Sequence, residues 1–386
     1  MLICAYTEGR AQVPDLHRSA VVFILPTLKT GGGNRVFIEI ANVLCQRRPV
    51  TLLSPNNSSD SHTFFLNSRV EQRSIGGMAG GRVSKLFNIL RLVRYVNRHH
   101  RGDVVIVSDP FLSVFSCLLR ARFVLRFFQS DDYALFDDGY VLGKGSALQL
   151  YKLFTRISYR YKGIGFVFNS RFVYDRFCLT AGASLHPYRQ VSPALNHHVF
   201  QSKGRPQGSA GRITICLVAR KHPLKGLDTF LNAWRDLPFE CRQNVERVLL
   251  ISHDDLSAFD LRNCEVIRPA SDYDIAAAFE RSDIFISTSR TEGFGLPPLE
   301  AMACGCAVIT SDSGGVNEYA EDGHNCLMYQ PGDEDALRTL LTGLISDPEK
   351  RWRLGIKGIE TAKNFTWEKS ARALEGIIDV PVKKSY

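Results

Sequence analysis

Short runs of β-branched and aromatic residues alternate with segments of helical periodicity along most of this chain. Parallel sheets covered by helices on both faces arise from this alternation. The sequence therefore predicts an α/β protein of two doubly wound, Rossmann-like domains that face each other across a cleft. The predicted strands are residues 20–25, 50–53, 104–107, 123–128 and 165–168 in the first half, and 212–218, 247–252, 264–267, 284–287 and 307–310 in the second.

A stretch rich in glycine, proline and serine, residues 201–211, is the best candidate for a linker between the two domains. The length of 386 residues suffices for two or three domains that each bury a core. We therefore predict an N-terminal domain over residues 20–200 and a C-terminal domain that begins at residue 212. Residues 1–19 lack the apolar core of a secretory signal, so we expect a flexible N-terminal extension.

Charge distinguishes the two halves. Residues 1–200 hold 25 Lys and Arg against 12 Asp and Glu, whereas residues 201–386 hold 23 against 27. A basic N-terminal half suits an acidic substrate, an anionic membrane or nucleic acid. No recognised nucleic-acid motif accompanies the charge, so we expect no nucleic-acid partner. No apolar stretch reaches the roughly 18 to 20 residues of a membrane span.

The ten cysteines are scattered along the chain without a CxxC pair. Cys304 and Cys306 lie in a run of small and apolar residues, which favours buried, reduced thiols over a disulfide or a zinc site. We therefore expect a cytoplasmic protein.

The segment after the strand at 284–287 is the richest candidate for chemistry. It contains two glycines, Gly293 and Gly295, which let the backbone turn tightly, and two prolines that suit the first turn of a helix. Free amides at a helix N-terminus bind anions, and a diphosphate fits such a site. Glu292 and Glu300 stand on either side of this turn. In open parallel sheets, ligands bind beyond the carboxyl ends of the strands, so this loop is expected at the ligand site.

These residues resemble the EX7E motif of retaining glycosyltransferases, and glycosyltransferase family 4, which has the GT-B fold, is the most similar family. The second half resembles that family nearly throughout, and the first half only thinly. The resemblance implies a nucleotide-sugar donor held mainly by the C-terminal domain, residues 212–364, and a last helix, residues 365–386, that crosses back to the N-terminal domain. It is carried by EGFGLPPLEAMACG (residues 292–305), LVAR (217–220) with Lys225 and Gly226, SDIFI (282–286), SGGVNE (313–318) with Gly323, Gly31 to Gly33, and Phe365 to Trp367.

The resemblance also implies a role for individual residues. Arg220 and Lys225 correspond to the basic pair on the diphosphate, where they would stabilise the charge that develops as the sugar–phosphate bond breaks. Glu292 corresponds to the acid beside the donor sugar, and Glu300 to the acid on the ribose hydroxyls. Further donor contacts are expected from Gly293, Phe294, Gly295, Leu296, Arg268, Pro269, Ala270, Gly32 and Gly33. Glu318 matches a position where the family often has Glu, without an assigned role.

The acceptor side departs from the family pattern. Many members carry a His after an N-terminal strand, whereas this chain reads Gln129, Ser130, Asp131, Asp132 and Tyr133 there. This arrangement resembles rhamnosyltransferase-like members. Gln129, Asp131 and Asp132 are therefore the acceptor-side candidates, and a polar loop end without a role in binding is the alternative.

The resulting hypothesis is a retaining glycosyltransferase that acts on a glycan or lipid-linked acceptor in cell-surface polysaccharide or glycoconjugate synthesis. The family needs no metal and no other cofactor, and the acidic pairs at 131–132 and 137–138 are not DxD motifs. A nucleotide-sugar epimerase and a non-catalytic sugar-binding subunit are the alternatives on the same fold. The absence of a GxGxxG fingerprint disfavours an NAD-dependent oxidoreductase.

A membrane contact is the last expectation. Arg91, Arg94, Arg98 and Arg101 recur at three- and four-residue spacing, so they share one face of a predicted helix, while Leu86, Leu90 and Val93 line another. A core helix with a solvated basic face is the alternative interpretation. The charge suits peripheral, salt-reversible binding at the inner face of the cell membrane.

Overall fold

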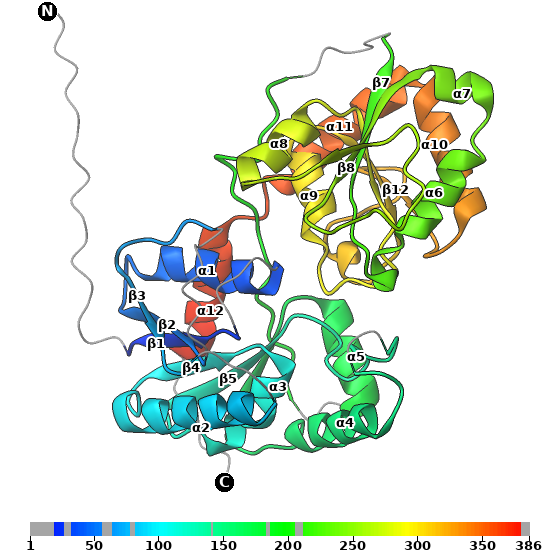
Figure 1. The fold of residues 1–386 in the computed structure, drawn as a ribbon. Helices are drawn as coiled ribbons and strands as arrows, with labels where there is room; N and C mark the ends of the chain where they lie inside the picture. The colour runs from blue at the N-terminus through cyan, green and yellow to red at the C-terminus, as the bar shows by residue number, and fades with distance from the viewer. Residues whose placement is uncertain are drawn as a thin grey trace, which may run out of the picture. The chain divides into compact units, whose positions relative to one another are not determined.

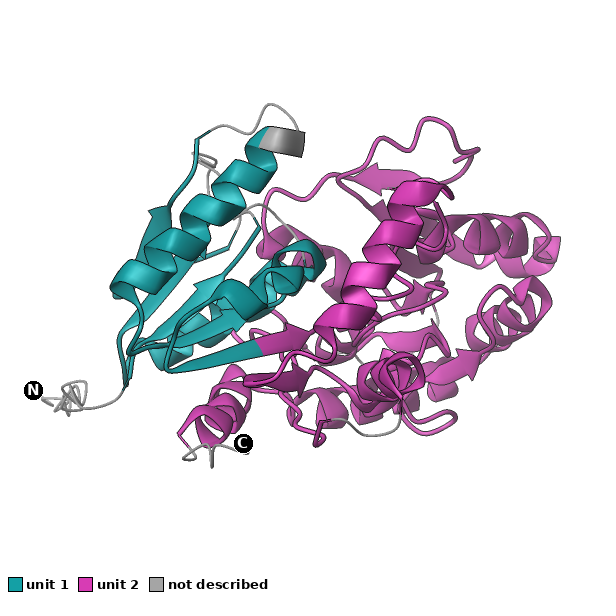
Figure 2. Ribbon diagram, turned by 90° about the horizontal axis from the view of Figure 1, so that it is seen from below, with its two compact units in different colours: residues 1–125 teal, residues 126–386 magenta. Residues whose placement is uncertain are grey.

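The computed structural model describes residues 19–26, 32–55, 64–77, 82–139, 142–182, 186–204 and 211–379. Contacts divide the chain into two compact units, residues up to Leu125 and residues from Arg126 onward (Figure 2). This division falls inside a strand, and the bounds of the N-terminal domain, linker and C-terminal domain given above stay predictions.

The first sheet has six strands in the order β3-β2-β1-β4-β5-β6. β1 pairs in parallel with β2 and β4, and β2 with β3, so that Val21 lies opposite both Val50 and Val104. The strands are β1 (Val21–Ile24), β2 (Val50–Ser54), β3 (Val70–Ser74), β4 (Val104–Val107), β5 (Phe123–Phe128) and β6 (Ile164–Phe168). The helices in this part of the chain are α1 (Gly32–Leu44), α2 (Arg82–His99), α3 (Pro110–Val114), η1 (Ser116–Leu118), α4 (Ser146–Ser158) and α5 (Arg171–Ala181).

The second sheet repeats that topology. Its order is β12-β11-β10-β7-β8-β9. Read from the β9 edge, with β7 counted as the first strand, this is again the order 3-2-1-4-5-6. The strands are β7 (Ile213–Val218), β8 (Val245–Ile251), β9 (Glu265–Ile267), β10 (Ile284–Ser287), β11 (Ala307–Ser311) and β12 (Leu327–Tyr329). The α-helices, labelled in Figure 1, are α6 (Leu227–Arg235), α7 (Phe239–Gln243), α8 (Asp272–Glu280), α9 (Leu296–Ala303), α10 (Glu334–Ser346), α11 (Pro348–Ala362) and α12 (Trp367–Ile378). Two 3-10 helices are η2 (Pro223–Lys225) and η3 (Gly315–Glu318).

The burial of the strands explains why they could be predicted from the sequence. β1, β2, β4 and β5 are buried at every position, as expected of parallel strands covered on both faces. In the second sheet, alternate residues of β7 join two different apolar clusters, with Ile215 in one and Cys216 in the other. The predicted α/β class with two doubly wound sheets is therefore confirmed.

Two edge strands were not predicted. β3 has one buried residue followed by four exposed ones, and β12 has only three residues. Neither gives the apolar run or the alternation on which strand prediction depends. Helix α2 was predicted, but its buried residues include Leu92 and Val96, whereas Leu86 and Leu90 are exposed.

The last helix begins at a side-chain cap. Thr366 accepts a hydrogen bond from the Lys369 amide, and the residue pairs as an isolated bridge with Leu195. Ser370 Oγ donates to the Ser192 carbonyl at 2.6 Å. These contacts tie the start of α12 to the segment that follows α5, within the second unit.

The cysteines of the described residues are free, and Cys304 and Cys306 are buried, as predicted. Cys117 is exposed, so burial does not hold for every thiol. No helix among the described residues has the length and apolar character needed to cross a membrane. The described part of the chain holds no group of three or more His, Cys, Asp or Glu suited to a metal ion.

Candidate donor and acceptor site

The reversal of strand order in the second sheet places two loops side by side. β7 and β10 are parallel neighbours, with Ile284 opposite Ile215, and chain connections leave in opposite directions from them. At such a switch point the loops at the carboxyl ends separate and leave a crevice for a ligand. The loops after β7 and β10 carry Arg220, Lys225 and Glu292, so the fold brings these predicted residues to one edge of one sheet.

Lys225 and Glu292 form an ion pair across this switch point, with 2.6 Å between Nζ and Oε1. A hydrogen bond from a side chain to the backbone and a close approach of the two backbones connect these loops. Thr288 Oγ1 donates to the Lys225 carbonyl at 2.8 Å, and Gly226, at a φ of 62°, approaches Thr288 so closely that a Cβ would lie 2.2 Å from its carbonyl oxygen. A side chain at position 226 would therefore push the loops apart. Both charged groups are only partly exposed, which suits an anion-binding site.

The turn after Glu292 presents a helix N-terminus. Gly295, at a φ of 82°, precedes α9. Pro297 and Pro298 in the first turn carry no N–H, so the amides that this helix N-terminus can offer an anion are those of Gly295 and Leu296. The Tyr319 hydroxyl donates to the Gly295 carbonyl and fixes the direction of this peptide. Burial, together with the nearby Glu292 carboxylate, raises the pKa of Tyr319 well above its usual value, so the hydroxyl keeps its proton. Tyr319 was not predicted from the sequence, although it directly follows the Gly314–Glu318 segment.

Two predicted donor contacts are buried. Glu300 lies on α9 with 4% of its surface exposed, below the amide turn. Phe294 is buried against the rings of Tyr319 and Phe365, with ring centroids 5.5 and 5.8 Å away. Its side chain belongs to the core, so a donor contact from Phe294 would have to come from its backbone.

Arg220 is oriented by an aspartate that the sequence analysis also missed. Arg220 Nε lies 3.0 Å from Asp254 Oδ2, and the Lys221 amide donates to the same oxygen at 2.9 Å. Burial alone would raise the pKa of Asp254, but these hydrogen bonds and the charge of Arg220 outweigh it and lower the pKa. Asp254 therefore stays charged and holds the guanidinium. Asp254 follows β8, the strand next to β7, and this position after a strand could have identified it from the sequence.

The remaining predicted donor residues lie at other strand ends. Arg268 and Ala270 are exposed and Pro269 is buried, directly after the edge strand β9. Gly32 and Gly33 are exposed at the first turn of α1, in the first unit, and Gly31 lies outside the described residues.

The acceptor-side candidates differ in environment. Asp132 is buried, and its carboxylate accepts a hydrogen bond from Arg126 Nη2 at 2.8 Å, while the Tyr151 hydroxyl donates to its carbonyl. Asp131 is partly exposed and accepts from Arg176 Nε at 2.7 Å. The Gln129 carbonyl accepts from Asn169 Nδ2 at 3.0 Å. Both carboxylates thus have an arginine partner, and Asp131 is the better placed of the two for a ligand because it is partly exposed.

These acceptor-side loops touch the donor turn itself, within the second unit. Ser170 Oγ donates to the Gly293 carbonyl at 2.6 Å, and a Cβ on Gly293 would lie 1.8 Å from the Gln129 carbonyl oxygen. Glu318 joins the same region, because its carboxylate accepts from the Arg171 amide and from Gln190 Nε2. Glu318 therefore fastens η3 to the N-terminus of α5, a role that the sequence did not reveal.

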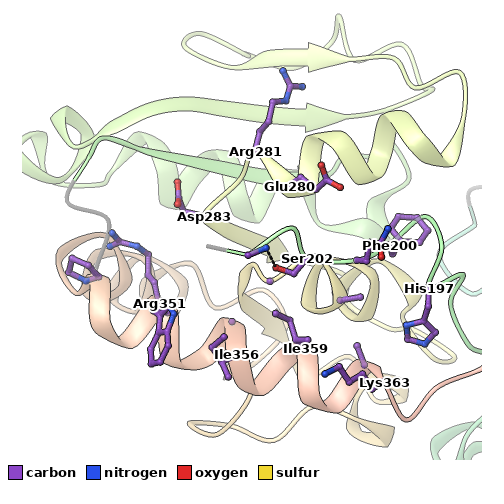
Figure 3. Close-up of a pocket in the computed structure, with 18 residues that line it drawn as sticks. His197, Phe200, Ser202, Glu280, Arg281, Asp283, Arg351, Ile356, Ile359 and Lys363 are labelled. Atoms are coloured by element: carbon purple, nitrogen blue, oxygen red, sulfur yellow. Dashed lines mark hydrogen bonds between the residues drawn. The ribbon is translucent and has the colours of Figure 1, made fainter. Parts of the chain in front are cut away.

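The cavity drawn in Figure 3 is separate from this candidate site. It has a volume of about 750 Å³ and is lined by residues such as Asp283, Gly305, Arg351 and Lys363. Asp283 and Gly305 come just before β10 and β11, so the cavity opens at the amino ends of these strands. The charged pair and the amide turn lie at the carboxyl ends, where ligands bind in such sheets, and we place the candidate site there.

Comparison with known proteins gives partial matches in sequence. Residues 201–361 match the family model described as "Glycosyl transferases group 1". An uncharacterized glycosyltransferase of Methanocaldococcus jannaschii is 28% identical over 41% of this chain and 45% of its own. A D-inositol 3-phosphate glycosyltransferase of Corynebacterium kroppenstedtii is 28% identical over 50% and 46%. The serotype-specific mannosyltransferase WbdA of Escherichia coli is 27% identical over 42% and 21%. The chain thus spans less than half the length of each of these relatives.

Solved structures match nearly the whole chain in fold. Sucrose-phosphate synthase from Thermosynechococcus elongatus superposes with a TM-score of 0.77 at 15% identity, covering 94% of this chain and 98% of that one. HepE of Anabaena, solved in complex with UDP, gives a TM-score of 0.71 at 15% identity, covering 94% and 100%. At these identities the likeness establishes the fold, which is GT-B.

Proposed function

Because residues 201–361 match the model of the group 1 glycosyltransferases and the chain has the GT-B fold, we propose that the protein is a retaining glycosyltransferase with a nucleotide-sugar donor. The observation that carries the proposal is the Lys225–Glu292 pair at the β7/β10 switch point, beside the amide turn of α9. A cation, an acid and free amides at one strand edge suit a sugar diphosphate. HepE, of the same fold, was solved with UDP.

The chemistry follows from where charge develops. As the bond between the sugar and the diphosphate breaks, negative charge grows on the departing phosphate. Lys225 and Arg220 are the cations on the two loops that would stabilise it, and the amides at the start of α9 add to them. When the donor binds, Lys225 can turn from Glu292 to the phosphate, which frees the carboxylate for the hydroxyls of the donor sugar. Fixed charges on anchored loops lower the barrier without reorganisation at the moment of reaction.

No protein base is needed in this scheme. The leaving phosphate oxygen takes the proton of the acceptor hydroxyl on the same face of the sugar, so the new glycosidic bond keeps the anomeric configuration. We propose that no metal takes part, with Lys225, Arg220 and the amides serving as the positive partners of the diphosphate. The presence of Glu292, Arg220 and Lys225 in the loops after β7 and β10 supports an enzyme over a non-catalytic sugar-binding subunit.

We propose a glycan or lipid-linked acceptor of cell-surface polysaccharide or glycoconjugate synthesis, reached at an anionic membrane surface. The support is the charge of the first 200 residues, which hold 25 Lys and Arg against 12 Asp and Glu. Cations near anionic lipid each contribute about 1 kcal/mol to binding, and salt screens this attraction. Peripheral attachment on the cytoplasmic side is part of the proposal.

A thermal-shift screen against UDP, GDP and dTDP sugars tests the donor class. A ligand that binds only the folded protein raises its melting temperature by mass action. We expect one nucleotide base to stand out, and transfer of the labelled sugar should then require an added acceptor. Conversion of the donor sugar without any acceptor would support an epimerase instead. No shift with any nucleotide sugar would contradict the proposal.

A further inference from the structure

Helix α4 carries large apolar side chains on the face that it turns to solvent. Leu150, Leu153, Phe154 and Ile157 are 53%, 54%, 43% and 45% exposed. Their spacing of three, four and seven residues places them in one stripe along two turns. A separate face of α4, formed by Leu148, Tyr151, Thr155 and Ser158, is the one buried in the protein. The exposed stripe is therefore in addition to the core-facing one.

Such a stripe needs an explanation because an isolated exposed leucine is ordinary, whereas a contiguous row of apolar side chains marks an interaction site. Gly145 caps α4 without a side-chain hydrogen bond, and Tyr159 follows its end. Figure 1 shows the helix in the part of the chain that also contains α5. We call Leu150, Leu153, Phe154 and Ile157 the α4 stripe.

The charge along α4 is basic, although Asp137 lies beside the helix in an ion pair with Lys152. Residues 139–174 contain six Lys and Arg and no Asp or Glu. Lys152 and Arg156 follow one another at four-residue spacing on α4, and Arg160 lies in the turn after it. Lys152 and Arg156 both lie over the Tyr133 ring, 4.8 and 5.3 Å from its centroid, and Lys152 also pairs with Asp137. The exposed cations near the stripe are thus Arg156 and Arg160.

We propose that α4 is the membrane-docking element of this protein. The α4 stripe would enter the boundary between headgroups and acyl chains, while the cations beside it reach the lipid phosphates, as in helices that lie in the plane of a membrane surface. This inference deepens the membrane contact in the proposed function and rests on it, but it does not depend on the transfer reaction. It also differs from the sequence expectation, which located the contact on the arginine face of α2.

The chemistry of the surface decides among possible occupants. A second copy of this chain would bring an equally acid-free, cationic helix against the first, and like charges would oppose that pairing. An anionic lipid surface satisfies both components at once, because it offers phosphates to the cations and an apolar interior to the stripe.

Vesicle co-sedimentation tests the inference with three variants of the full chain, two triple variants and one single variant. Leu153→Ser/Phe154→Ser/Ile157→Ser removes most of the α4 stripe and leaves the cations. Leu86→Ser/Phe87→Ser/Leu90→Ser does the same to the exposed apolar residues of α2. Leu179→Ser is the matched control, because Leu179 is 77% exposed on α5 outside the stripe. Circular dichroism and the melting temperature check that each variant folds.

With vesicles of phosphatidylcholine and phosphatidylglycerol, we expect the α4 variant to lose about tenfold or more in partitioning, and Leu179→Ser to match the wild type. Residual binding of the wild type at high salt should disappear in the α4 variant, because the apolar contribution is not screened. Equal binding of the α4 variant and wild type would overturn the role of α4 while leaving the membrane contact in place. Loss in the α2 variant alone would return the contact to α2.

Failure of the wild type to bind anionic vesicles would overturn both the inference and the proposed membrane contact, whereas donor binding in the thermal-shift screen would be unaffected. Sedimentation equilibrium covers the remaining occupant. A dimer of the wild type that dissociates in the α4 variant would show that the stripe joins two copies of the chain, and it would contradict the lipid assignment.

Discussion

The loops of the donor side and those of the acceptor side differ in how their charged groups are used. On the donor side, Lys225 and Glu292 face each other at a partly exposed strand edge, and Gly226 fixes the separation of their loops. On the acceptor side, one ion pair, Arg126 with Asp132, is buried, the Arg176–Asp131 and Lys152–Asp137 pairs are partly exposed, and Arg156 of α4 lies at the surface. The charged pair at the candidate donor site is thus partly exposed, as a small anionic ligand requires, whereas the charges on the candidate acceptor side support the fold or lie at the surface.

The largest effect is expected on the donor side from Glu292→Gln. Turnover should fall by about 10²–10³, because one charge-assisted contact made in the transition state is worth about 2.7–4 kcal/mol. Nucleoside diphosphate should still bind, which separates the variant from an unfolded one. Glu349→Gln, an exposed acid in the first turn of α11, is the control and should transfer sugar at the wild-type rate. Normal transfer by Glu292→Gln would end the assignment of this residue.

The contact between the two sides can be broken by Gly293→Ala. A Cβ there would lie 1.8 Å from the Gln129 carbonyl oxygen, so the backbone must shift, and we expect a loss of about 1–3 kcal/mol in the free energy of unfolding. Gly343→Ala is the matched control on α10, where a Cβ meets nothing within 4 Å. It should raise stability by about 0.5–1 kcal/mol. Urea unfolding compares the two, and equal stabilities would show that the loops do not meet at Gly293.

Glu318→Gln tests the same contact with a smaller expected loss in the free energy of unfolding. The amide keeps one acceptor oxygen for the Arg171 amide or Gln190 but loses the second, which should cost about 1 kcal/mol. Glu246→Gln on β8, whose acid forms only an exposed pair with Arg247, should be close to neutral. Equal urea midpoints for the two variants would remove Glu318 from the contact.

The smallest effect concerns pH on the acceptor side. Burial against Phe166, with ring centroids 3.8 Å apart, lowers the pKa of His186 below its usual 6.5. The unfolded chain therefore binds a proton that the folded chain does not, so stability should be full above about pH 6.5 and fall as the pH drops below it. His186→Phe should flatten this dependence between about pH 7.5 and about pH 5.5, while the exposed His324→Gln should not. A wild-type melting temperature that rises on acidification would contradict the lowered pKa.

Much of the fold and of the donor side could be predicted from the sequence, and little of the acceptor side. Strands β4, β5 and β10 were predicted to the residue because buried parallel strands read as unbroken apolar runs. Arg220, Lys225 and Glu292 were predicted because each follows a strand within a recognisable motif.

The missed residues act through partners that are far apart in sequence. Tyr319 orients a peptide 24 positions away, and Asp254 pairs with a residue 34 positions away. Asp132 looked equivalent to Asp131 until burial beside Arg126 separated them. The α4 stripe was not predicted either. A helix with apolar residues on two faces has the sequence pattern of a core helix, and only the structure shows that one of these faces is exposed to solvent.

Calorimetric titration with a nucleoside diphosphate and with its nucleoside tests the account most directly. The variant is Lys225→Met, and the control is Arg262→Met, an exposed arginine that pairs only with Asp260 in the same unit. We predict that Lys225→Met weakens the diphosphate by about tenfold to a hundredfold, the value of a charge-assisted contact, and leaves the nucleoside unchanged. Equal losses for the two ligands, or an unchanged diphosphate affinity, would place the phosphate site elsewhere and contradict the account.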